Sequence, residues 1–168
     1  MRILGIDPGL DTTGYGIIED NKGIFKLLEA GIIKTSAGQP IQNRVKKIYR
    51  GVNELIKKFR PDALVLERLY SHYKHPVTSI LMGHSRGVIC LASGERDIPL
   101  ISYPAKRVKK AVTGNGNASK AQVQRMVQNI LCLSQTQIPN DVTDALAIAI
   151  AHSHIVSRYR LACYEKIG

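Results

Sequence analysis

The sequence has no tryptophan, and aromatic residues make up only 5% of its 168 residues. A surface of stacked aromatic side chains, the usual platform for single-stranded nucleic acids, is therefore not expected. No apolar run approaches the roughly 18 residues that a membrane helix needs, so no membrane partner is expected either. Residues 1–7 do not resemble a signal peptide, because their apolar run is short and an acid ends it.

Cysteine is also scarce. The three cysteines, Cys90, Cys132 and Cys163, are odd in number and lack the spacing of a metal site. Cys90 and Cys132 lie among apolar neighbours, which predicts reduced and mostly buried thiols. These features indicate a protein of a reducing cytoplasm.

Acidic residues are also few: the sequence has 13 Asp and Glu and 24 Lys and Arg, which gives a formal net charge of +11. A small domain this basic usually binds a polyanion such as DNA, RNA or an acidic membrane, although the charge could serve solubility alone. The length and the 44% content of hydrophobic residues fit one globular domain over residues 1–168. The last ten or so residues are expected to form a loose tail.

The apolar pattern predicts strands and helices in alternation. Strands are expected at residues 2–7, 15–19, 24–33, 63–67 and 98–102. Longer helices are expected at 41–59, at 77–93, after a capping box at Ser119–Gln122, and at 141–156, with a short helix after Pro104. This order predicts an α/β fold with one mixed five-stranded sheet flanked by helices.

Four acids stand out by their position. Asp7 ends the first strand and Glu67 ends the central one, whereas Asp141 and Asp144 open the last helix three residues apart. The four would converge if the last helix packed near the first and fourth strands. Oxygen ligands suit Mg²⁺, and two divalent ions ~4 Å apart can activate a water and stabilise the leaving oxygen of a phosphodiester.

Each acid also has a structural interpretation. Asp7 precedes Pro8-Gly9 and could be a turn residue. Asp141 and Asp144 could simply favour the positive end of a helix. Glu67 favours function more strongly, because it directly follows a buried apolar run.

Several segments, in order along the chain, resemble bacterial RuvC resolvases, which cut four-way DNA junctions. These are residues 5–16 (GIDPGLDTTGYG), Glu67 after its strand, Tyr103-Pro104-Ala105 with Val108-Lys109, the loop 114–116, and 141–149 (DVTDALAIA). A single segment would be weak evidence, whereas the ordered set covers nearly the whole chain.

The resemblance implies a single ribonuclease-H-like nuclease domain that works as a homodimer. It implies Mg²⁺-dependent nicking of two opposed strands of a four-way (Holliday) junction, which leaves 5′-phosphate and 3′-hydroxyl ends. The resemblance implies two metal ions per site, for which Mn²⁺ can substitute. It also implies that the RuvA and RuvB proteins are partners in the bacterial cytoplasm. Asp7, Glu67, Asp141 and Asp144 match the family's catalytic metal ligands.

The resemblance also implies DNA-binding residues, namely Tyr70, Tyr73, Lys109 and Lys120. Family members often carry Phe three residues after the catalytic Glu, whereas this chain has Tyr70 there and a slightly lengthened loop at 71–76. Whether Tyr70 or Tyr73 enters the junction therefore stays open. Lys120 lies in the first turn of a helix, a natural phosphate site, although a solvated lysine is the alternative.

The remaining basic residues and glycines have simpler interpretations. Solvation is expected for five basic residues on the outer face of the first helix, which are Arg44, Lys46, Lys47, Lys57 and Lys58. A structural role is expected for His152 and His154. Gly83 and Gly87 lie on one helical face and are the candidate dimer contact, with packing inside the monomer as the alternative.

Three rival functions are considered. An actin-like or sugar-kinase ATP site also begins with a strand, an Asp and a glycine hairpin, but it needs two such domains and the chain is too short for both. Another ribonuclease-H-like nuclease, acting on RNA or RNA–DNA hybrids, would suit the lysines equally well. A non-catalytic junction-binding protein would have no reason to keep four acids in a basic cleft.

Overall fold

The fold is known from a computed structural model that describes residues 1–68, 76–133 and 138–164. Its strands are β1 (Arg2–Asp7), β2 (Thr12–Asn21), β3 (Ile24–Lys34), β4 (Ala63–Glu67) and β5 (Leu100–Tyr103). They form a five-stranded sheet in the order β3-β2-β1-β4-β5. The first three strands are antiparallel neighbours, whereas β4 runs parallel to β1 and to β5. The predicted mixed sheet is therefore confirmed.

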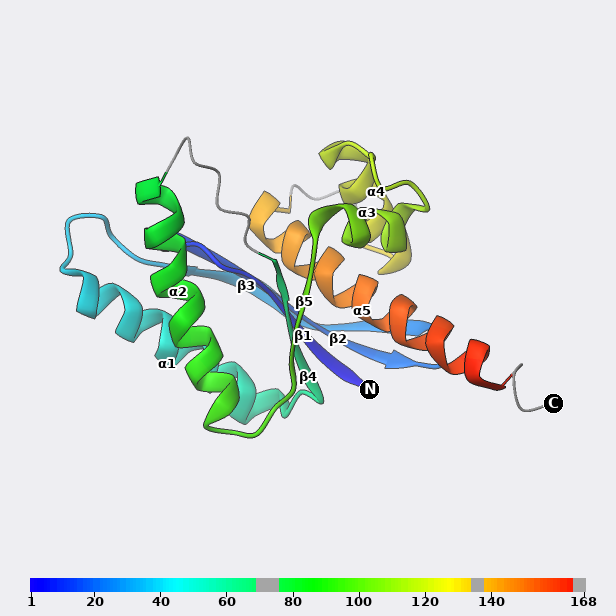
Figure 1. The fold of residues 1–168 in the computed structure, drawn as a ribbon, viewed down its shortest axis with the longest axis horizontal. Helices are drawn as coiled ribbons and strands as arrows, with labels where there is room; N and C mark the ends of the chain where they lie inside the picture. Colours follow the sequence, from blue (N-terminus) through cyan, green and yellow to red (C-terminus); the bar gives the residue numbers. More distant parts are fainter. Residues whose placement is uncertain (69–75, 134–137, 165–168) are drawn as a thin grey trace.

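Helices cover both faces of the sheet (Figure 1). On one face lie α1 (Ile41–Phe59) and α2 (Pro76–Gly94). On the other lie α3 (Ala105–Thr113), α4 (Lys120–Ile130) and α5 (Asn140–Tyr164). Each face has its own hydrophobic core, so β1 and β4 are buried on both sides.

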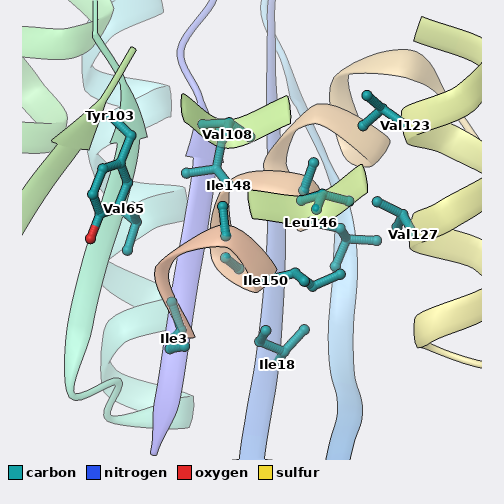
Figure 2. Packing of buried hydrophobic residues seen from close by; sticks show 14 of the residues in the cluster. Ile3, Ile18, Val65, Tyr103, Val108, Val123, Val127, Leu146, Ile148 and Ile150 are labelled. Carbon is teal, nitrogen blue, oxygen red and sulfur yellow. The ribbon is translucent and has the colours of Figure 1, made fainter. Parts of the chain in front are cut away.

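Strand alternation decides which side chains meet which helices. Ile3 and Val65 belong to the core under α5, together with Leu146 and Ile150 (Figure 2). The residues between them in the strands, which are Leu4, Ile6, Leu64 and Leu66, belong to the core under α1 and α2. Asp7 and Glu67 have odd numbers like Ile3 and Val65, so the same alternation turns both acids toward α5.

Two glycines let α5 lie directly on the sheet. A Cβ atom on Gly5 of β1 would lie 2.1 Å from the carbonyl oxygen of Ala145, and one on Gly14 of β2 would lie 2.1 Å from that of Asp141. Any other side chain would hold the helix further away. The first turns of α5 consequently lie next to the end of β1.

Most element boundaries agree with the pattern, and the differences have local causes. The capping box of Ser119 and Gln122 is present at the start of α4. The fifth strand begins at Leu100, because Ile98 bonds instead to Ser93 in the turn after α2. The last helix runs to Tyr164 and past Val156, since no Gly or Pro interrupts it, and residues 165–168 lie outside the described part.

Two predictions about exposure are wrong. Arg44 is only 7% exposed, because its guanidinium bonds to Asp11 in the loop after β1 and to Thr35, the residue that follows β3. Cys132 is exposed, because it lies in the turn after α4 with a positive φ of 50° while Leu131 takes the buried position. Cys90 is half-buried, and neither of these two thiols forms a disulfide.

Candidate active site

Asp7 and Glu67 end two adjacent parallel strands and line one cleft. Ile6 pairs with Leu66, so the two acids follow at the same level of the sheet. Asp144, in the early part of α5, lines the same cleft. The cleft has a volume of about 360 Å³, and its lining is completed by Lys109, Lys120, Ala105, Val108, Val123 and Ala147.

Asp141 lies beside this cleft and does not line it. It is in the first turn of α5, and its backbone and Cβ pack against Gly14 of β2. Its carboxylate is still close enough to raise the pKa of both Asp7 and Asp144. The structure therefore brings the four predicted acids together, with Asp7, Glu67 and Asp144 at the centre.

The acids oppose one another's ionisation. Burial, reinforced by the charges of Asp144, Asp141 and Glu67, raises the pKa of Asp7 from 3.8 to about 7. Burial followed by the charge of Asp144 raises the pKa of Glu67, and burial also raises the pKa of Asp144. Such a cluster of half-buried carboxylates is stabilised by a cation.

Two lysines supply positive charge to the cleft. The Nζ atom of Lys120, the first residue of α4, lies 3.7 Å from Oδ2 of Asp144. Lys109, on α3, also lines the cleft. Both lysines lower the pKa of Glu67 and of Asp144, against the effect of burial. The side chain of Lys120 is largely exposed, so its ammonium is available to a phosphate.

The donor set fits a hard divalent ion. Carboxylate oxygens are the ligands that Mg²⁺ prefers, and the cleft holds excess negative charge that such an ion would neutralise. Within the described residues, no three His, Cys, Asp or Glu side chains form a group that could hold an ion as they stand. The carboxylates would have to turn toward one another to share an ion.

Other predicted residues lie elsewhere. Tyr70 and Tyr73 fall within residues 69–75, outside the described part of the chain. His152 is buried and its Nδ1 lies 2.9 Å from the hydroxyl of Tyr103, so its expected structural role is confirmed. His154 likewise bonds the carbonyl of Ala111 and contacts the ring of Phe25.

Two further features of the site were not predicted, and only the second has a signal in the amino-acid sequence. The apolar wall of the cleft comes from small residues on α3, α4 and α5, which no pattern distinguished from ordinary core. The glycines under α5 were detectable, because Gly5, Gly14 and Gly16 interrupt apolar strands at alternate positions.

The strand order, the two-sided helical cover and the acids at the ends of β1 and β4 define a protein of the ribonuclease-H-like fold with a candidate metal-dependent site. Residues 3–152 match the family model described as crossover junction endodeoxyribonuclease RuvC. The chain belongs to the RuvC family.

Relatives and solved structures agree with this assignment. The protein of that description from Rhodopirellula baltica is 44% identical over 155 residues, which are 92% of this chain and 87% of the relative. The RuvC structure from Thermus thermophilus is 34% identical, with a TM-score of 0.86, over 94% of this chain and 96% of that one. The T. thermophilus RuvC in complex with Holliday junction substrate is 33% identical, with the same TM-score, over 93% and 94% of the two chains.

Proposed function

We propose that this chain is an endonuclease that resolves four-way DNA junctions by nicking two opposed strands, leaving 5′-phosphate and 3′-hydroxyl ends. One observation carries the proposal: three carboxylates and two lysines from distant parts of the sequence share one cleft. The family relationship supports a four-way junction as the substrate, because a relative of the same fold is known in complex with a Holliday junction. No helix among the described residues is long and apolar enough to span a membrane.

Asp7, Glu67 and Asp144 would hold Mg²⁺, with Asp141 contributing charge from the edge of the cleft. Two ions are expected per site, with Mn²⁺ as a substitute, and the bound metal would supply an activated water and stabilise the leaving oxygen. Lys120 and Lys109 would bind phosphates beside the carboxylates and orient the strand. The protein would act as a homodimer, together with RuvA and RuvB, in a bacterial cytoplasm.

A cleavage assay on labelled substrates tests this function. A synthetic four-way junction should be nicked symmetrically with Mg²⁺ and left intact with chelator. A linear duplex and an RNA–DNA hybrid of the same sequence should be cut far less. Preferred cleavage of the hybrid would instead favour a ribonuclease, and junction binding without cleavage at any metal concentration would favour a non-catalytic binding protein.

Replacing Lys120 by Ala should weaken junction binding for every junction sequence and reduce its salt dependence. Each phosphate contact releases about one counterion, so the slope of log affinity against log salt should fall by roughly one. Lys109→Ala should act similarly. Fluorescence anisotropy over a salt series in chelator measures both quantities.

Lys47→Ala is the matched control, because Lys47 is exposed on α1, across the sheet from the cleft. Its affinity and salt slope should equal those of the parent. A change of base preference in Lys120→Ala at an unaltered salt slope would contradict the phosphate contact.

Replacing Tyr70 by Ala should reduce junction cleavage roughly 10-fold or more, whereas Tyr70→Phe should be mild. An aromatic ring that stacks on an unpaired base is worth ~1–3 kcal/mol, and Phe keeps that ring. Fluorescent base analogues at the junction centre report the unstacking. If Tyr70→Ala unstacks these bases as well as the parent does and Tyr73→Ala does not, the role belongs to Tyr73.

Helix α2 carries the strongest evidence for a dimer. Its outer side exposes apolar residues at helical spacing, among them Val77, Ile80 (61% exposed) and Leu91 (54% exposed). Gly83 and Gly87 lie in the same stripe, are exposed, and have no atom within 4 Å of a Cβ placed on them. A two-fold pair of such stripes would bury this surface and present two cleavage sites to the two equivalent strands of a junction.

Replacing Ile80 by Glu should convert the dimer to a monomer at micromolar concentration and abolish paired nicking. A two-fold contact would place two like charges in one apolar interface, at a cost of several kcal/mol. Light scattering measures the mass. Ile24→Glu is the control, since Ile24 on β3 is 76% exposed but outside the stripe, and it should leave the mass unchanged. A stable monomeric parent, also on DNA, would contradict the dimer.

A further inference from the structure

Helix α2 also contacts the active-site end of the sheet, through Arg86. The Nη1 atom of Arg86 donates a hydrogen bond to the backbone carbonyl of Glu67 at 2.8 Å. Its Nη2 atom donates to the hydroxyl of Ser102 at 2.7 Å. A single half-buried guanidinium therefore joins α2, the last residue of β4 and the neighbouring strand β5.

The geometry of this contact matches the shape of a guanidinium group. Ser102 pairs with Leu66, the residue before Glu67, so the two acceptors lie on adjacent strands at nearly the same level. A planar guanidinium presents two donors at a fixed spacing and can bond both acceptors at once. A lysine ammonium carries all its donors on one nitrogen, so it lacks the two separate donor atoms that Arg86 places on the two acceptors.

The position of Glu67 gives the contact its significance. Glu67 is the end of β4, and the main chain beyond it is paired to β5 through the Arg68 amide and the Tyr103 carbonyl. Its carboxylate reaches the cleft from this strand end, so a displacement of the main chain at Glu67 would move the carboxylate relative to Asp7 and Asp144. Arg86 bonds the carbonyl of that same residue and so opposes this displacement.

We infer that Arg86 is a positioning residue that fixes the Glu67 carboxylate for metal binding. The inference rests on the proposed function, because it assigns Glu67 a metal. Arg86 acts through the main chain of Glu67 and lies on the face of the sheet covered by α2, whereas the cleft opens on the face covered by α5. Outer partners that orient a metal ligand typically contribute 10–100-fold to metal affinity or activity.

The test measures metal binding directly, without substrate. Mn²⁺ is titrated into the DNA-free protein by calorimetry, and the Mg²⁺ concentration for half-maximal junction cleavage is measured in parallel. Arg86→Gln should weaken Mn²⁺ binding and raise the half-maximal Mg²⁺ concentration, each about 10–100-fold. Junction affinity in chelator should be unchanged, and high Mg²⁺ should restore much of the cleavage rate.

Three further variants sharpen the result. Ser102→Ala removes the second anchor of the guanidinium and should shift the metal dependence in the same direction by a smaller factor. Arg86→Lys keeps the charge without the two-point contact and should resemble Arg86→Gln, and it carries the test if the glutamine variant does not fold. Arg50→Gln removes an exposed arginine of α1 and should match the parent throughout.

The outcomes separate the two hypotheses. If the parent binds Mn²⁺ and cleaves junctions but Arg86→Gln and Arg86→Lys show the parent's metal affinity, the inference is overturned and the proposed function stands. A lower cleavage rate in both variants at an unaltered metal dependence also overturns it, because that result indicates general structural damage. If the parent neither binds Mn²⁺ nor cleaves, both hypotheses fail together.

Discussion

Replacing Asp7 by Asn should lower the rate of junction cleavage at least about 10³-fold while junction binding stays intact or tightens. A metal ion contributes several kcal/mol to transition-state stabilisation, and each 1.36 kcal/mol is tenfold in rate. Affinity comes from phosphate contacts elsewhere, and removing a buried negative charge does not weaken them. Glu67→Gln and Asp144→Asn should behave alike, whereas Asp141→Asn should be milder because Asp141 does not line the cleft.

The same substitution should stabilise the metal-free protein, in a manner that depends on pH. The pKa of Asp7 is about 7 in the folded protein against an ordinary value of 3.8, so the folded state binds the proton more tightly than the unfolded chain. The free energy of unfolding of the parent therefore falls as pH rises from about 4 to 7 and stays low above that window. A shift of this size corresponds to at most about 4 kcal/mol.

Thermal unfolding in chelator at pH 5 and pH 8 measures this effect. Asp7→Asn should raise Tm at pH 8 by more than at pH 5, and added Mg²⁺ should stabilise the parent and not the variant. Asp97→Asn is the control, because Asp97 is exposed and its positive φ of 51° suits Asn. Near-normal cleavage by Asp7→Asn would refute the proposed metal site.

Replacing Gly14 by Ala should destabilise the fold and disable the site together. The new Cβ would lie 2.1 Å from the carbonyl oxygen and 2.8 Å from the Cβ of Asp141, so the start of α5 would have to move away from β2. Overpacking against main chain costs about 3 kcal/mol or more, which lowers Tm by roughly 6–12 °C for a chain of this size. Cleavage should fall even where the protein remains folded, because the same helix carries Asp144.

Gly38→Ala is the matched control, since nothing lies within 4 Å of a Cβ at Gly38. Its Tm should change little, in keeping with surface substitutions that usually stay within about 0.5 kcal/mol. If Gly14→Ala melted and cleaved like the parent, α5 would not rest on β2 as closely as the structure shows.

The mixed five-stranded sheet and the positions of two acids at strand ends could be predicted, because the periodicity of apolar residues marks where each strand begins and ends. Asp7 and Glu67 end apolar strands, and the parallel pairing of β1 with β4 then puts them side by side. The capping box at Ser119 could also be predicted, because it is defined by residue types at a fixed spacing. Local patterns of this kind survive into the folded state.

Contacts between side chains that are distant in the sequence could not be predicted from such local patterns. Arg44 follows the pattern of a solvated helix residue, and only the loop after β1 makes it a buried partner of Asp11. Arg86 was not singled out at all, because an arginine between Ser85 and Gly87 looks like any polar interruption of an apolar helix. The role of Arg86 depends on where the ends of β4 and β5 lie relative to α2. No residue spacing in the sequence predicts that arrangement.

The alternation that turns Asp7 and Glu67 toward α5 also limits how this chain can change in evolution. Inserting or deleting one residue inside β1 or β4 would reverse the facing of every residue beyond it, and the acid at the strand end would point into the core under α1 and α2. Substitutions in these strands can therefore accumulate, whereas length changes should be confined to connections such as residues 35–40 between β3 and α1. A library of single-codon insertions selected for junction cleavage should recover variants in that connection and none within β1 or β4.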